Sequence, residues 1–291
     1  MIDTAAVDAA AVDTATVDTA VVLMSVYHRE SAENLDACLH SIVTQTLLPQ
    51  KIILVKDGPL PTFLEDVIDR YAGMHPDLFE IVPLPQNRGL TEALNTGLSS
   101  CHSDLIFRMD SDDLSLPDRF EKQLRFMQGH PDIGVLSSAM YEFDVDPDTP
   151  EHIKTVVADH DAIAKQMPWR NPINHPTCCY RTELIKQAGG YPELRYLEDY
   201  YLWAKLLCSG VRFHNLDEPL YLFRFNRATL TRRGGWINFR NECYLRWFLY
   251  RRGKATLATV VLAMALQLLL RFAPGRLQNL LWKTTRKRIS K

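Results

Sequence analysis

The sequence predicts an α/β fold in which a mostly parallel sheet is flanked by helices. Between residues 21 and 109, short apolar runs of strand length alternate with segments whose apolar residues recur at helical spacing. Acidic residues directly follow two of these runs, as ligand-binding side chains do in parallel sheets. The strands are expected at residues 21–26, 52–55, 80–84 and 105–109, and the helices at 35–43, 64–71 and 90–98.

The second half of the chain is less regular. A further apolar run spans residues 133–138, and prolines interrupt the pattern after it. A helix is expected again at residues 198–207, beginning with the acidic pair Glu198-Asp199. We interpret this half as the second wall of a cleft whose first wall is the parallel sheet.

Length, cysteine use and charge limit the class of protein. The 291 residues, 46% of them hydrophobic, suffice for one large domain with an appendage. The six cysteines include no Cys-x-x-Cys pair, so we expect reduced thiols in a cytosolic protein. Residues 246–291 carry 11 Lys or Arg and no acidic residue, whereas the remainder has a net charge of −13. The acidic body argues against nucleic acid as the partner.

The chain divides into three expected segments. Residues 1–20 repeat Val-Asp every five residues among Ala and Thr, which predicts a mostly disordered low-complexity leader. We expect residues 21–235 to form the main α/β domain and residues 236–291 to form a basic, amphipathic helical tail.

The tail contains a 16-residue apolar run at 255–270, interrupted only by Thr256, Thr259 and Gln267, which share one stripe of a helix. A membrane span needs about 20 apolar residues. Basic residues flank the run, so we expect a peripheral helix on an anionic membrane surface. A helix packed on the main domain is the alternative. All the candidate site residues described below precede Thr231, so the tail should be dispensable for their chemistry.

The acidic turn at residues 110–113, Asp-Ser-Asp-Asp, is the most informative segment. Three carboxylates so close together raise one another's pKa unless a cation lies among them. Mg²⁺ or Mn²⁺ suits such oxygen ligands and can also hold a diphosphate. Taken alone, the turn could equally be a solvated cap of the next helix, which Pro117 and Asp118 predict.

Six sequence elements together carry a resemblance to a known family. They are Ser25-Val26-Tyr27, Val55-Lys56-Asp57-Gly58, Asn87-Arg88-Gly89-Leu90, the acidic turn with Pro117-Asp118-Arg119, Asn171-Pro172 with His175-Pro176, and Glu198-Asp199-Tyr200 with Trp203. In this order they resemble the inverting family 2 glycosyltransferases of the GT-A fold, in particular the exopolysaccharide and O-antigen type that includes amylovoran-biosynthesis enzymes. The resemblance covers residues 21–231 and implies a Rossmann-like nucleotide-diphospho-sugar transferase sheet.

The resemblance implies a nucleotide site at the ends of the first strands. Ser25, Tyr27 and Arg88 would border the nucleotide, and Asp57 would accept a hydrogen bond from its base, commonly uracil. Lys56 stands where the family often has another acidic residue, which makes the nucleotide less certain.

The resemblance also implies a metal and diphosphate site. Asp110 and Asp112 would border the ribose and the Mg²⁺ or Mn²⁺ ion, with Asp112 and Asp113 as metal ligands and Asp113 the best match to the direct ligand. Arg224 and Arg227 would lie near the diphosphate, unless they are merely solvated.

On the acceptor side, the resemblance makes Asp199 the catalytic base, with Glu198 and His175 beside the acceptor. Glu198 could instead only cap its helix, and His175 could be an ordinary buried histidine.

The expected function is the metal-dependent, inverting transfer of one sugar, from a nucleotide-sugar such as a UDP-sugar to a lipid-linked saccharide, at the inner face of the cell membrane. Processive members carry Gln-x-x-Arg-Trp, whereas Cys243 precedes Arg246-Trp247 here. The alternatives are a catalytically silent nucleotide-binding or scaffold protein of the same fold, and a nucleotidyltransferase, although no clear glycine-rich phosphate loop is present. A glycoside hydrolase would not need the acidic turn.

Overall fold

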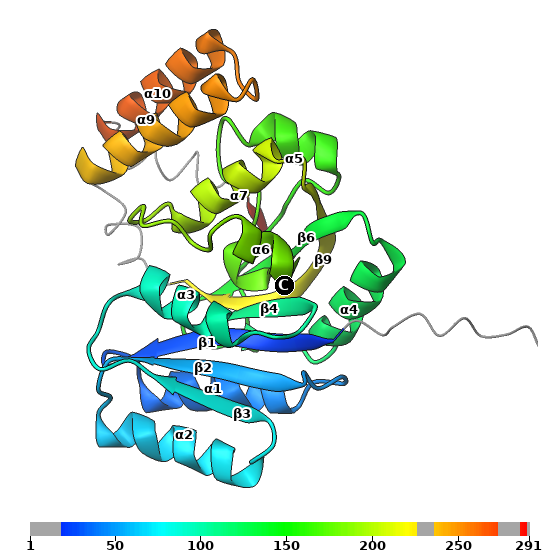
Figure 1. Ribbon diagram of the computed structural model, residues 1–291, viewed down its shortest axis with the longest axis vertical. Coiled ribbons are helices and arrows are strands. Elements are labelled where there is room, and N and C mark those ends of the chain that lie inside the picture. The colour runs from blue at the N-terminus through cyan, green and yellow to red at the C-terminus, as the bar shows by residue number, and fades with distance from the viewer. Residues whose placement is uncertain (1–18, 226–235, 273–285, 290–291) are drawn as a thin grey trace, which may run out of the picture.

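The computed structural model describes residues 19–225, 236–272 and 286–289, and its centre is a ten-stranded sheet (Figure 1). The expected leader, apart from Thr19 and Ala20, lies outside the described residues, and so does Arg227. The strands are β1 Ala20–Tyr27, β2 Lys51–Asp57, β3 Phe79–Pro83, β4 Leu105–Asp110, β5 Leu114–Ser115, β6 Ile133–Phe143, β7 His152–Lys154, β8 Cys179–Arg181, β9 Arg212–Arg224 and β10 Arg286–Arg288.

The helices follow the expected positions in the first half and add several in the second. They are α1 Ala32–Val43, α2 Thr62–Met74, α3 Leu90–Ser100, α4 Arg119–Gly129, α5 His160–Gln166, α6 Thr182–Gln187, α7 Glu198–Cys208, α9 Trp236–Arg251 and α10 Leu257–Phe272, with a short 3-10 turn at His175–Thr177. Helix α1 begins where the Ser31 hydroxyl accepts the amide of Asn34 at 3.1 Å.

The parallel part of the sheet has the order β3-β2-β1-β4, with β1 paired to both β2 and β4. The strand order reverses between β1 and β4, which is the point at which such sheets bind ligands. Strand β1 also begins at Ala20, one residue before the expected domain boundary.

Both faces of β1 are buried, which explains its continuous apolar sequence. Val21 and Leu23 belong to the core beneath α3 and α7, whereas Val22 and Met24 belong to the core beneath α1 and α2. Figure 1 shows α1 and α2 on one side of the sheet and α3 on the other. Gly97 lets α3 approach closely, since a Cβ there would lie 2.4 Å from the Leu23 side chain.

The second half extends the sheet with mixed pairings. Strand β8 is antiparallel to both β4 and β6, and β9 runs parallel to β6 and antiparallel to β5. Helices α9 and α10 contact each other, and α9 contacts α7 (Figure 1). Strand β10 pairs antiparallel with β7, so the tail, expected to be helical, also ends in a strand of the catalytic sheet.

Candidate active site

The carboxyl ends of the parallel strands bring the first predicted site residues together. In the strand register, Ser25 of β1 lies opposite Asp110 of β4, and Tyr27 lies opposite Asp57 of β2. Ser25 and Tyr27 are half-buried. The expected nucleotide-binding edge is therefore a continuous row of side chains across β2, β1 and β4.

Asp57 holds the loop that leads into α3. Its Oδ1 accepts the amide of Arg88 at 2.7 Å and its Oδ2 accepts the amide of Gly89 at 2.9 Å, and its side chain is buried. Gly58 has a φ of +87°, and a Cβ there would lie 2.4 Å from the Asn87 amide nitrogen. Asp57 thus has a structural role that the sequence did not predict, while the contact with a base stays a prediction.

The two basic residues near this edge have acidic partners on helices. Lys56, where the family often has an acidic residue, forms an ion pair with Glu65 of α2 at 2.8 Å. Arg88 is half-exposed and lies 3.9 Å from Glu92 one turn along α3. Of these two, Arg88 is the one that can reach a nucleotide without breaking a short ion pair.

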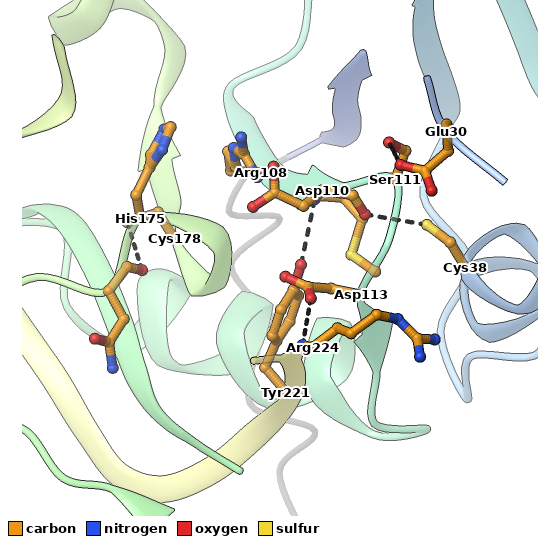
Figure 2. A network of polar contacts seen from close by, with 12 residues as sticks. Glu30, Cys38, Arg108, Asp110, Ser111, Asp113, His175, Cys178, Tyr221 and Arg224 are labelled. Atoms are coloured by element: carbon orange, nitrogen blue, oxygen red, sulfur yellow. Dashed lines mark hydrogen bonds and ion pairs between the residues drawn. The ribbon is translucent and has the colours of Figure 1, made fainter. Parts of the chain in front are cut away.

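The acidic turn is enclosed from both sides (Figure 2). The buried Arg108 guanidinium forms an ion pair with Asp110, and the amide of Asp110 donates to the Tyr221 hydroxyl at 3.2 Å. The carbonyl of Asp110 accepts the Cys38 thiol at 3.2 Å. These contacts come from β4, β9 and α1, and they fix the start of the turn.

Strand β9 supplies the other clamp. The amide of Arg224 donates to Asp113 Oδ1 at 2.6 Å, and its Nε donates to the Asp112 carbonyl at 2.9 Å. The Arg224 guanidinium also lies 4.7 Å from the Phe143 ring centroid. Arg224 is expected near the diphosphate, and these hydrogen bonds show that it also secures the acidic turn.

Two carboxylates of the turn, Asp112 and Asp113, bind protons unusually tightly. Burial, and then repulsion by Asp110 and Glu30, raises the pKa of Asp112 to about 7. Burial, and then repulsion by Asp112 and Asp110, raises the pKa of Asp113 well above its usual range. Asp113 is fully buried, and its Oδ2 has no hydrogen-bond partner among the described residues.

These features fit a divalent cation, because positive charge beside Asp112 and Asp113 would offset their repulsion and satisfy the orphaned oxygen. In the described ranges, no three His, Cys, Asp or Glu side chains already converge as metal ligands. Asp112 is half-buried and is therefore the more accessible of the two expected ligands. Asp113 could contribute Oδ2 while Oδ1 stays bound to β9.

A cavity of about 530 Å³ adjoins the turn and is lined by residues from both halves of the chain, although Ser25, Tyr27, Asp57 and Arg88 are not in its wall. Asp110 lies in its wall, and so do His175, Glu198 and Asp199 from the second half. Asp112, Asp113 and Arg224 are not in this wall, although they belong to the same turn and its clamp. The cavity therefore contains the expected base together with one edge of the expected nucleotide and metal site.

Asp199 is presented by the first turn of α7 and oriented by Asn171. The Asn171 side-chain amide donates to Asp199 Oδ2 at 2.8 Å, and its Oδ1 accepts the Ile173 amide at 3.1 Å. Asn171 is a positioning residue that the sequence analysis quoted as part of a motif but did not assign. The signal in the sequence that could have identified Asn171 was its position before Pro172, in a segment without helix or strand periodicity.

His175 is buried, in agreement with the alternative that it is an ordinary buried histidine. Its Nε2 lies 3.0 Å from the Tyr191 hydroxyl, and its ring packs edge-on against Trp203. Burial, with Arg108 nearby, lowers its pKa well below the usual range, so the imidazole is neutral. His175 can therefore shape the cavity wall but is unsuited to carry a positive charge there.

The tail contributes to this cavity, which the sequence analysis did not predict; whether catalysis needs the tail stays a prediction. Side chains from α9, α10 and β10 line it, including Glu242, Gln267 and Arg286. The sequence missed this because the three elements lie 40 to 90 residues after Asp199 and carry no motif.

Comparison with known proteins agrees with this geometry. The model of "Glycosyl transferase family 2" matches residues 21–188. The chain belongs to this family. The amylovoran biosynthesis glycosyltransferase AmsE of Erwinia amylovora is 38% identical to this glycosyltransferase, over 77% of the present chain and 83% of its own length.

A second relative of this family 2 glycosyltransferase is the Escherichia coli UDP-Gal:alpha-D-GlcNAc-diphosphoundecaprenol beta-1,3-galactosyltransferase. It is 33% identical over 90% of the present chain and 94% of its own length. The crystal structure of S. aureus TarS 1-349 in complex with UDP-GlcNAc has a TM-score of 0.64 at 18% identity, covering 87% of this chain and 72% of that one. This likeness shows that the glycosyltransferase has the GT-A fold.

Proposed function

We propose that this glycosyltransferase moves one sugar from a nucleotide-sugar, with a UDP-sugar as the expected donor, to a lipid-linked saccharide, with inversion at the anomeric carbon. The observation that carries the proposal is the cavity that unites Asp110 of the acidic turn with Asp199 of α7. The names of the two relatives, one acting in amylovoran biosynthesis and one on a diphosphoundecaprenol-linked acceptor, support the substrate classes.

In the proposed reaction, Asp199 takes the proton from the acceptor hydroxyl as its oxygen attacks the anomeric carbon. The bond from that carbon to the nucleoside diphosphate breaks, and the diphosphate departs from the opposite face. A positioned carboxylate base contributes about 10²- to 10⁴-fold to such a step. Asn171 fixes the direction of the carboxylate, and the enclosed cavity aligns the two sugars.

We further propose that Mg²⁺ or Mn²⁺ binds at the acidic turn through Asp112, with Asp110 beside it and Asp113 Oδ2 behind it. When bound, the cation neutralises charge on the leaving diphosphate. The raised pKa values of Asp112 and Asp113 and the orphaned oxygen support this proposal.

The α9–α10 hairpin supports a place at the membrane. Within the described residues, no helix combines the length and the apolar character needed to cross a bilayer. In α10, Val260 and Ala263 are buried, whereas a set of large apolar side chains is 43–69% exposed. These are Leu257, Val261, Leu262, Leu266, Leu268 and Leu269.

Two alternatives were given for the tail, a helix on the membrane surface and a helix packed on the domain, and α10 has features of both. Ala263 and Gln267 of its weakly polar stripe face the protein, and its apolar face is exposed. On α9, the exposed residues Trp236, Tyr244 and Trp247 add aromatic groups that favour a membrane interface. We therefore propose a peripheral enzyme on the anionic cytoplasmic leaflet, where its lipid-linked acceptor would lie.

A transfer assay tests the proposed function. A panel of UDP-sugars is offered with Mn²⁺ and a GlcNAc-diphospho-lipid acceptor, and the product is examined by mass spectrometry and NMR. We expect one added sugar whose anomeric configuration is opposite to that of the donor. Several added sugars or a retained configuration would contradict the proposal, as would binding of UDP-sugars without any transfer or hydrolysis.

A further inference from the structure

The last described strand brings basic side chains into the wall of the cavity that contains Asp199. Strand β10 pairs antiparallel with β7, and Arg286 lies directly opposite Lys154 in the register. The ladder continues beyond the strand, since the Ile289 amide donates to the Glu151 carbonyl at 3.2 Å. Both Lys154 and Arg286 line the cavity.

The Arg286 guanidinium is held in a fixed orientation. Its Nε donates to Glu142 Oε2 at 2.5 Å and its Nη2 donates to Glu142 Oε1 at 2.7 Å. The Glu142 side chain is 2% exposed, and the guanidinium lies 5.7 Å from the Phe225 ring centroid. A two-point contact with a buried carboxylate leaves Arg286 little rotational freedom.

Lys154 lies directly opposite Arg286 on the neighbouring strand, and both side chains belong to one part of the cavity wall. Glu142 holds the Arg286 guanidinium in place, and Lys154 brings an ammonium group to the same part of the wall. Guanidinium and ammonium groups together are typical of sites that bind phosphate.

We propose that Lys154 and Arg286 bind a phosphoryl group of a substrate, so that β10 is part of the active site. This inference rests on the proposed function, which supplies two sources of that group: the diphosphate of the donor and the diphosphate of a lipid-linked acceptor. Strand β10 then takes part in substrate binding, in addition to the membrane role proposed for α9 and α10.

Binding of inorganic pyrophosphate, measured by calorimetry in EDTA, tests the site without any transfer reaction. We expect affinity to fall about tenfold or more in Lys154→Ala and in Arg286→Ala, and to stay at the parental value in Lys287→Ala. Lys287 is the matched control, because it is exposed and is the adjacent basic residue of β10. Lys154→Ala is the decisive variant, since Arg286→Ala leaves the buried Glu142 without its cation and could unfold the strand.

Two further arms identify the source of the phosphoryl group. Weaker UDP binding in Lys154→Ala would assign the site to the donor. A lost preference for a GlcNAc-diphospho-lipid over a neutral GlcNAc alkyl glycoside would assign it to the acceptor. Parental affinity of Lys154→Ala for pyrophosphate would overturn the inference. If the parent and all variants fail to transfer a sugar, but Lys154→Ala still binds pyrophosphate more weakly than the parent, only the proposed function is contradicted.

Discussion

Single carboxylates in this enzyme have different roles according to their surroundings. Asp199 is half-buried and lies in the cavity wall with a hydrogen bond from Asn171, which suits a base. Asp113 is fully buried and tied to β9, so part of its role is structural. Asp112 lies between these extremes, and its raised pKa means that its charge changes near neutral pH.

The first prediction concerns pH and the cation at Asp112. Its pKa is about 7 in the folded, metal-free enzyme and lower in the unfolded chain. Its contribution to the free energy of unfolding is therefore fully present below the unfolded pKa and is lost as the pH rises through about 7. A divalent cation competes with this proton, so the rise in melting temperature caused by Mn²⁺ with UDP should be larger at pH 8 than at pH 6.

Thermal unfolding of the parent and of Asp112→Asn, with and without Mn²⁺, measures this effect. The amide cannot ionise, so the variant should lose both the metal response and this part of the pH dependence. Glu193→Gln, an exposed substitution before α7, is the control. A parental Mn²⁺ response in Asp112→Asn would show that Asp112 is not a ligand.

The second prediction concerns the buried Asp57. Asp57→Ala removes the acceptors of the Arg88 and Gly89 amides at the start of α3. We expect the free energy of unfolding to fall by about 2 kcal/mol, because two hydrogen bonds to a buried carboxylate are lost. Chemical denaturation measures the change, and Glu92→Ala, at a partly exposed position, is the matched control on the same helix. Equal stability of the two variants would exclude the structural role of Asp57.

At the scale of elements, the α9–α10 hairpin has two functional faces. Its inner face closes the cavity through Glu242 and Gln267, and its outer face exposes leucines and tryptophans. In the proposed function, membrane attachment and acceptor binding would therefore involve the same two helices. This arrangement suits an acceptor whose lipid stays in the bilayer while its saccharide enters the cavity.

The third prediction separates these faces. Leu262→Asp with Leu269→Asp alters only exposed positions, so the fold should be retained. Each leucine is worth about 1.5–3 kcal/mol when fully buried in an apolar phase. We therefore expect at least about tenfold weaker binding to anionic liposomes in flotation. Met74→Asp, equally exposed on α2, is the control. Unchanged flotation of the double variant would show that the outer face does not bind lipid.

At the scale of the whole molecule, the parallel half was predictable and the tail was not. The strands β1, β2 and β4 are apolar runs buried on both faces, which is a local signal. Strand β9 was missed because Asp217, Glu218 and Pro219 interrupt its apolar pattern. Strand β10 reads Arg-Lys-Arg, and its position depends on pairing with β7 and on the distant Glu142.

The same distinction holds for the site. Motifs identified Asp110, Glu198 and Asp199, which the fold brings to one cavity. They did not identify Asn171 as the partner of Asp199, or Arg286 as part of the wall, because these contacts join residues distant in sequence. The acidic body and the basic tail, which looked separable in the sequence, meet at the Glu142–Arg286 ion pair.

The most direct test of the central claim is a comparison of turnover and donor binding in Asp199→Asn. The substitution keeps the shape of the side chain and removes its basicity. We expect turnover to fall about 10²- to 10⁴-fold. The dissociation constant for the best UDP-sugar donor should stay within about twofold of the parental value. A base contributes to the chemical step rather than to donor binding. Near-parental turnover in Asp199→Asn would contradict the assignment of Asp199 as the base.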